Sequence, residues 1–250
     1  MYLRRFAVDG LLMTQRTGHA AKPVGTPVVG VINHFYTLKT RDGGSDEVED
    51  ALAVLEGRAK TVFERIDDGH LPLTKEDKTV MAEFVGFQMC RGKQYRDLGQ
   101  WVFDQSTPAL RRRVRNVYRK HAADRIAEAE TYDLTPLINQ NHVVRSLVRT
   151  GQLMTNVLVN MRWQIVRWPK PVLLSTDHPA ICWHRPHESS PWGVSNAIEV
   201  RMPLSPTQAL VASWHDGPDV EQVLRGDKIA AMTMNYHTER HAVGRVTFPG

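Results

Sequence analysis

Asp177 stands in the most distinctive polar patch of the chain, the run STDHP at residues 175–179. Apolar residues 172–174 lead into this run and residues 180–183 lead out of it, which predicts a tight turn between two strands. The proline that ends the run biases His178 towards an extended backbone. A carboxylate at a strand end, with hydroxyl groups beside it, can be aimed at a metal ion or a substrate. The alternative is that Asp177 only accepts hydrogen bonds from amides of its own turn.

Two carboxylates in a predicted helix over residues 46–67 are the next candidates. Glu49 and Glu56 are seven residues apart, close to two helical turns, so both lie on one side and border the apolar stripe of the helix. At that border a carboxylate can bind a divalent cation or act as a general base. The alternative is a solvated acidic face with ordinary pairs such as Glu56 and Lys60.

Arg91 ends a second predicted helix, which is apolar on most sides. An arginine beside a core needs a carboxylate or phosphate partner, because a buried unpaired charge is costly. One interpretation is an anion clamp, and the other is a structural salt bridge to Glu49 or Glu56.

A weaker pattern joins Glu56 and Asp177 to the pair Glu199 and Arg201 on a later predicted strand. It resembles the magnesium-binding acidic set of nucleases, except that an arginine stands where such enzymes have a lysine. The loop histidines 178, 184 and 187 are better explained as polar loop residues than as zinc ligands, because no helix presents a repeat of them.

The segment from Pro108 to Glu130 holds most of the excess positive charge. Seven basic residues against three acidic ones give it a formal charge of +4. Four-residue steps place Arg111, Arg115 and Arg119 in one stripe, and Arg112 adjoins it. Arginines near aromatic residues suit phosphate contacts and base stacking, whereas a solvated helix face is the alternative. The predicted nucleic-acid-binding residues are Arg111, Arg112, Arg115 and Arg119.

Hydrophobic periodicity predicts the elements that position these residues. Four helices are expected, over about 46–67, 74–91, from Pro108 onwards, and 136–160. Before them, residues 1–25 are predicted to be an extended start and a loop, and 26–39 one or two strands. After them we expect strands at 162–168, 172–176, 180–184, 197–202 and 209–214, a helix at 218–236 and a closing strand at 241–248. The result is an α+β fold in one domain, 1–250, with an antiparallel sheet of N- and C-terminal strands packed against about four helices.

Composition narrows the classes of protein. The 250 residues carry a formal net charge of +5, a mildly basic balance that tolerates a polyanionic partner. No apolar run reaches the roughly 18 residues of a membrane-spanning helix, and no secretory leader is evident, so no membrane association is expected. Two cysteines are too few for a disulfide framework and favour a cytoplasmic location. Phosphate-loop, dinucleotide-binding and Gly-x-Ser-x-Gly patterns are absent.

Four stretches of the chain resemble the domain-of-unknown-function family numbered 4238. They are YLRRFAVDG; INHFYTLK with SDEVEDALAVLEGRAKTVFERID; MAEFVGFQMCRG; and LLSTDHPAICW with VRMPLSPTQAL and MNYHTERHAVGRV. The resemblance spans nearly the whole chain in the expected order. It implies bacterial and phage occurrence and an α+β fold, with no particular reaction. Members of the family usually carry a histidine-containing segment just before the YLRRF-like stretch, and this chain begins inside that stretch.

Two functions follow as hypotheses. The first is a nuclease-like hydrolase of a phosphodiester or other anionic substrate, with Glu49, Glu56, Arg91 and Asp177 as catalytic groups. Glu56 and Asp177 would hold a divalent cation such as Mg²⁺, and the arginine would stabilise developing negative charge. The second is a non-catalytic module that binds nucleic acid or a protein, for example in phage defence or a toxin system.

Overall fold

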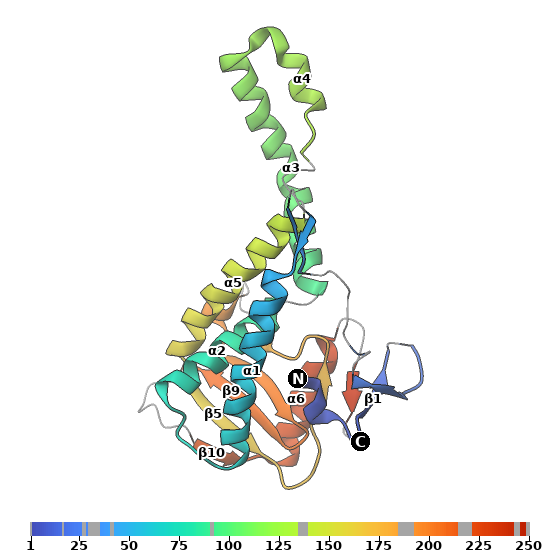
Figure 1. Ribbon diagram of the computed structural model, residues 1–250, viewed down its shortest axis with the longest axis vertical. Helices are drawn as coiled ribbons and strands as arrows, with labels where there is room; N and C mark the ends of the chain where they lie inside the picture. The colour runs from blue at the N-terminus through green and yellow to red at the C-terminus, as the bar shows by residue number, and fades with distance from the viewer. Residues whose placement is uncertain are drawn as a thin grey trace.

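The computed structural model describes most of the chain and has the α+β architecture expected from the sequence. It describes residues 2–16, 18–26, 29, 36–40, 43–90, 93–134, 140–184, 193–214, 222–242 and 246–248. Two sheets are flanked by helices, and one helical hairpin projects from this body (Figure 1).

The larger sheet has five strands, in the order β10-β5-β9-β8-β7. Neighbours run antiparallel except β10, which runs parallel to β5. Side chains alternate between the two faces, so that Val200 and Met202 of β8 enter one core cluster while Val211 of β9 enters another. The strands are β5 (Arg162–Arg167), β7 (Ile181–Trp183), β8 (Glu199–Ser205), β9 (Gln208–Ser213) and β10 (Gln222–Arg225).

The second sheet joins both ends of the chain, whereas a single sheet of N- and C-terminal strands was expected. Its four strands are β2 (Lys22–Gly25), β1 (Leu11–Gln15), β11 (Val246–Phe248) and β6 (Ser175–Thr176), in that order. The prediction for residues 1–25 was wrong in detail: the 3₁₀ helix η1 (Tyr2–Phe6) precedes β1 and β2. The strands predicted at 26–39 fall mostly outside the described residues, which show a small hairpin of β3 (Leu38–Thr40) and β4 (Gly43–Ser45).

Three helices cover one face of the larger sheet: α1 (Glu47–Asp67), α2 (Lys75–Cys90) and α5 (Gln140–Asn160). The bounds of α1 agree with the sequence pattern within one residue. Helix α2 is buried on nearly all sides, also as expected. It lies so close to α5 that a Cβ atom on Gly86 would be 3.0 Å from the carbonyl oxygen of Gly151. Glycine at this crossing therefore lets the two backbones touch.

Helix α6 (Lys228–Arg240) covers the opposite face, where Ala231 and Met234 pack against Ala209 and Val211. The helix predicted at 218–236 is confirmed over 228–236 and wrong at 222–225, which form β10. Asp227 then caps α6, with its carboxylate accepting a 2.7 Å hydrogen bond from the Ala230 amide.

The projecting hairpin, hereafter the arm, consists of α3 (Lys93–His121), η3 (Ala123–Arg125) and α4 (Ile126–Thr131). A helix was expected to start at Pro108, but Pro108 lies inside α3. Just before it, the hydroxyls of Ser106 and Thr107 donate to the carbonyl oxygens four residues earlier. The arm is exposed on most of its surface, so water can bond the carbonyl that the proline leaves without a partner.

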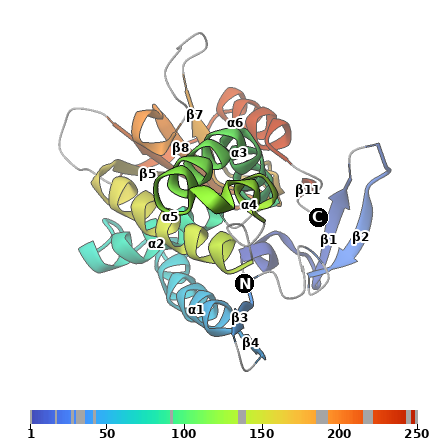
Figure 2. The same ribbon diagram turned by 90° about the horizontal axis from the view of Figure 1, so that it is seen from above.

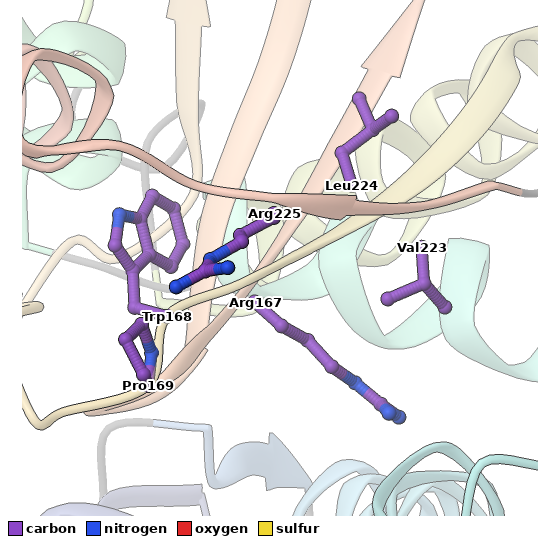
Figure 3. A pocket seen from close by; sticks show the side chains of 6 residues that line it. All are labelled: Arg167, Trp168, Pro169, Val223, Leu224 and Arg225. Atoms are coloured by element: carbon purple, nitrogen blue, oxygen red, sulfur yellow. The ribbon is translucent and has the colours of Figure 1, made fainter.

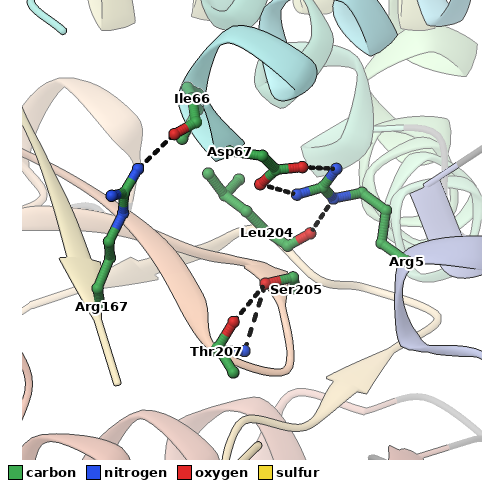
Figure 4. Close-up of polar contacts among 7 residues, drawn as sticks. All are labelled: Arg5, Ile66, Asp67, Arg167, Leu204, Ser205 and Thr207. Atoms are coloured by element: carbon green, nitrogen blue, oxygen red, sulfur yellow. Dashed lines mark hydrogen bonds and ion pairs between the residues drawn. The ribbon is translucent and has the colours of Figure 1, made fainter. Parts of the chain in front are cut away.

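The N-terminal segment is tied to the end of α1 and to the sheet (Figure 4). Both terminal nitrogens of Arg5 donate to Asp67 at 2.8 Å, and Arg5 Nε donates to the Leu204 carbonyl at 2.7 Å. Arg167 of β5 donates to the Ile66 carbonyl at the end of the same helix. No helix in the described part of the chain has the length and apolar character needed to cross a membrane.

Candidate functional site

Two of the predicted nucleic-acid-binding arginines hold the arm together. Arg111 donates to the carbonyl oxygens of Glu130 and Tyr132, at 3.1 and 3.4 Å. Arg115 forms an ion pair with the Glu130 carboxylate. These side chains therefore face the returning chain of α4, and the stripe expected from four-residue spacing is partly used inside the arm.

The surface of α3 that does not face α4 is exposed over most of its described side chains, and we call it the outer face; Arg119, one turn beyond Arg115, lies at its border. Its distal half carries four basic residues, and none of them makes an ion pair with any residue that the structure describes. They are Arg112, Arg113, Arg119 and Lys120. Of the predicted set, Arg112 and Arg119 thus lie on a free surface, and Arg113 and Lys120 extend it.

Apolar side chains continue the outer face towards the body. Leu98, Trp101 and Val102 are 54%, 58% and 49% exposed. Their spacing from Arg112 and Arg113 keeps all of them on one side of a 3.6-residue helix. The sequence signal for the distal half of this face is the recurrence of polar residues at 112, 113, 116 and 120; the apolar residues at 98, 101 and 102 give no such signal. We missed the first half of the face because the helix was expected to begin only at Pro108.

The base of the arm is anchored to α5. The Tyr95 hydroxyl lies 2.6 Å from Thr150 Oγ1 and 3.1 Å from Ser146 Oγ. Near the tip, Nε and one terminal nitrogen of Arg125 each donate to an oxygen of the Glu128 carboxylate at 2.7 Å. The arm is therefore held to α5 at its base and by an internal ion pair near its tip, and neither contact uses the basic residues of the outer face.

The predicted catalytic carboxylates lie on elements from different faces of the larger sheet. Glu49 and Glu56 are half-buried on α1, whereas Asp177 is exposed in the turn between β6 and β7. That turn lies near α6, because His178 interacts electrostatically with His241 at the end of α6. Figure 2 shows α1 and α6 on opposite sides of the molecule. Arg91 lies outside the described residues.

The structure also does not join Glu199 to Glu56. Glu199 bonds Arg201 of its own strand at 2.6 Å, on the sheet face away from α1. Across the described ranges, no group of three or more His, Cys, Asp or Glu side chains is arranged to hold a metal ion.

A comparison with protein-family models gives one match, over residues 1–248, to the family described as protein of unknown function DUF4238. The chain belongs to this family. No curated protein and no solved structure matches the chain. The family match agrees with the resemblance found in the sequence.

The DUF4238 chain also has a shallow hollow of about 290 Å³ at the β5–β10 edge, which the sequence did not predict (Figure 3). Trp168 lies in its wall and donates through Nε1 to the Asp227 carbonyl at 2.9 Å. Arg167 and Arg225 also line it, but the Arg167 guanidinium turns away to the Ile66 carbonyl. Of the two arginines that line the hollow, Arg167 is therefore already hydrogen-bonded to the end of α1.

Proposed function

We propose that this DUF4238 protein binds nucleic acid through the outer face of α3. The observation that carries the proposal is the group of four exposed basic residues, Arg112, Arg113, Arg119 and Lys120, without ion-pair partners among the described residues. The phosphates of a polyanion can pair with these side chains, and the release of counterions from the polyanion drives binding.

The apolar half of the outer face favours single-stranded nucleic acid. At about 1.5 Å per residue, the stretch from Leu98 to Lys120 is roughly 33 Å long, enough to contact several nucleotides. Trp101 offers an exposed ring on which an unpaired base can stack, and bases inside a duplex cannot reach such a ring. The cations then follow the phosphates beyond it.

The test is the affinity for fluorescein-labelled single- and double-stranded oligonucleotides, measured by anisotropy at several salt concentrations. The variant R112Q/R113Q/R119Q/K120Q should lose most of the affinity. The slope of log K against log salt should become shallower by up to about 3, because each lost phosphate contact removes about 0.7–0.9 from it.

The matched control removes the same charge elsewhere, in R16Q/K75Q/K170Q/K228Q. These four residues are exposed and lie outside the arm. The control should keep the wild-type slope within about one. Equal losses in the two variants would show that only net charge matters, and would contradict an interface on the arm.

Hydrolysis of a phosphodiester is a second proposal, now centred on Asp177. It is supported by Asp177, which is exposed and interacts electrostatically with His178. Burial and the nearby His241 lower the pKa of His178 although Asp177 raises it, and the net direction favours the neutral form of a general base. Incubation of the same oligonucleotides with and without Mg²⁺ tests it. Cleavage by the wild type that is lost in D177N supports the proposal, and no cleavage under either condition contradicts it.

A further inference from the structure

A row of polar side chains crosses the larger sheet beneath α6. Arg162 of β5 pairs with Ser213 of β9, Ser213 with Glu199 of β8, and Glu199 with Trp183 of β7. Directly paired residues have their side chains on the same face. The neighbour Val200 enters the core on the α1 side, so this row lies on the α6 side.

Arg201 lies two residues beyond Glu199 on β8, so its side chain is on the same face of the sheet as Glu199. Its Nε donates to Glu199 at 2.6 Å, and its guanidinium carbon is 4.8 Å from the centre of the Trp183 ring. The side chain is only 15% exposed. Its terminal nitrogens have no hydrogen-bond partner among the residues described, so the fork is held in place with its donors still available.

Polar atoms of β5, β9 and α6 on this side of the sheet are also buried and lack hydrogen-bond partners within the described chain. They are Nε of Arg162, Oγ of Ser213 and Oγ1 of Thr238. Thr238 lies one turn beyond Met234, on the side of α6 that packs on the sheet. Each such group costs free energy unless a ligand or water satisfies it.

Two histidines of α6 lie near Arg201 and other basic groups. Burial lowers the pKa of His237, and the charge of Arg201 lowers it further. Burial also lowers the pKa of His241, and Arg240 and His184 add to this effect. The i, i+4 spacing of His237 and His241 is a sequence signal for a shared helix face.

Carboxylates do not balance these cations. Glu199 is already bonded to Arg201, and Asp177, which is exposed, interacts electrostatically with His178. The remaining acid on this part of α6, Glu239, is exposed to solvent.

We propose that the α6 side of the sheet around Arg201 is a binding site for a phosphate-class anion. The terminal nitrogens of Arg201 hold the anion, His237 and His241 donate to it when protonated, and Trp183 orients the guanidinium. The site is separate from the outer face of α3 and does not require the arm to bind nucleic acid.

Inorganic phosphate is the first probe, added at constant ionic strength while the melting temperature is followed. Phosphate should raise the melting temperature of the wild type more than chloride does. R201Q should weaken phosphate binding by roughly tenfold or more, as expected for a charge-assisted hydrogen bond. E199Q should instead strengthen it, because a competing carboxylate is removed.

Opposite effects of these two substitutions separate a ligand site from a purely structural ion pair. If R201Q fails to fold, E199Q/R201Q keeps a neutral hydrogen-bonding pair and should show the same loss of phosphate binding. R16Q is the matched control for an exposed arginine and should bind as the wild type does. No phosphate-specific shift in the wild type, or equal phosphate affinity in R201Q, overturns the proposal.

Binding should also take up protons. An anion raises the lowered pKa values of His237 and His241, so affinity should increase as the pH falls from about 8 to about 6. Sulfate is the probe here, because its own charge is constant over this range. H237Q/H241Q should remove the dependence, H70Q should retain it, and a wild-type affinity independent of pH contradicts the role of the histidines.

The source of the phosphate group is distinguished with a pair of oligonucleotides, one with a 5′-phosphate and one with a 5′-hydroxyl. Tighter binding of the phosphorylated strand that is lost in R201Q assigns the site to a strand end. Equal binding of both strands, with inorganic phosphate still bound, assigns it to a free phosphate compound. The arm variant should leave phosphate binding unchanged, so failure of either proposal can be recognised separately.

Discussion

Among the described residues, arginine side chains are paired with carboxylates in the body but are largely unpaired on the outer face of the arm. In the body, Arg5, Arg65 and Arg201 each bond a carboxylate. On the outer face of the arm, Arg112 and Arg113 bond no carboxylate among the described residues. The same side-chain type thus fixes packing in one region and remains available to a partner in the other.

The difference shows that the number of arginines does not locate an interface. The arm itself contains both kinds, because Arg111 and Arg115 hold α4 while their neighbours Arg112 and Arg113 point outwards. What separates them is the pairing of each guanidinium in the folded chain. This comparison predicts large effects on stability in the body and small ones in the arm.

The largest stability effect is expected for F84A. Phe84 is 1% exposed and its ring meets Phe63 edge to face at 5.5 Å between centroids. Its truncation should lower the free energy of unfolding by about 3–5 kcal/mol. W101A on the arm should change it by less than about 0.5 kcal/mol. Urea unfolding of both variants measures the contrast, and equal losses would contradict it.

A smaller loss is expected for Y2F. The Tyr2 hydroxyl donates to the Pro203 carbonyl at 2.6 Å and lies 2.8 Å from Ser175 Oγ. Its removal leaves buried polar atoms unpaired and should cost about 1–3 kcal/mol. Y132F is the control, because the Tyr132 side chain, just after α4, is exposed. Thermal melting of Y2F at the wild-type temperature would contradict the role of this hydroxyl in holding η1.

Asp77 should make the stability of the body depend on pH. Burial alone raises the pKa of Asp77, but hydrogen bonds from Arg65 and Thr74 outweigh burial and lower it below the ordinary value. Because the folded pKa is the lower one, the stabilisation is present above the unfolded pKa and is lost as the pH falls through the folded pKa.

The variant D77N should accordingly be less stable than the wild type at neutral pH, and the difference should shrink below about pH 4. Urea midpoints measured from neutral to acid pH test this expectation. D124N, at an exposed position of the arm, should track the wild type throughout. A constant difference between D77N and the wild type would contradict the assignment.

The smallest effect is expected for R125Q. Arg125 and Glu128 form a pair whose side chains are both largely exposed, and such pairs contribute little to stability because solvent screens their charges. The melting temperature should stay close to that of the wild type, whereas a large drop would mean that the arm depends on this pair.

Strong periodicity explains which elements were predictable. In α1, Leu52, Leu55 and Ala59 bury one stripe, and the predicted bounds agree with the observed helix. In α3 most residues are exposed, so no burial stripe marks its first half, and Pro108 was taken as a start. β10 was missed because its four residues are too short to show a period of two and α6 follows at once.

Convergence in space was less predictable than the elements. Glu49, Glu56 and Asp177 are correctly placed on a helix and at a strand end, but the sequence does not say which sheet face each element covers. The layer order depends on long-range packing such as that of α6 on Val211. For the same reason, Arg112 and Arg115 were grouped together although only Arg115 faces Glu130.

The most direct test of the central claim is the salt dependence of oligonucleotide affinity for the wild type and R112Q/R113Q/R119Q/K120Q. The account predicts a steep slope for the wild type and a slope shallower by up to about 3 for the variant. The same slope in both proteins, or no measurable affinity in the wild type at low salt, would contradict an interface on the outer face of α3.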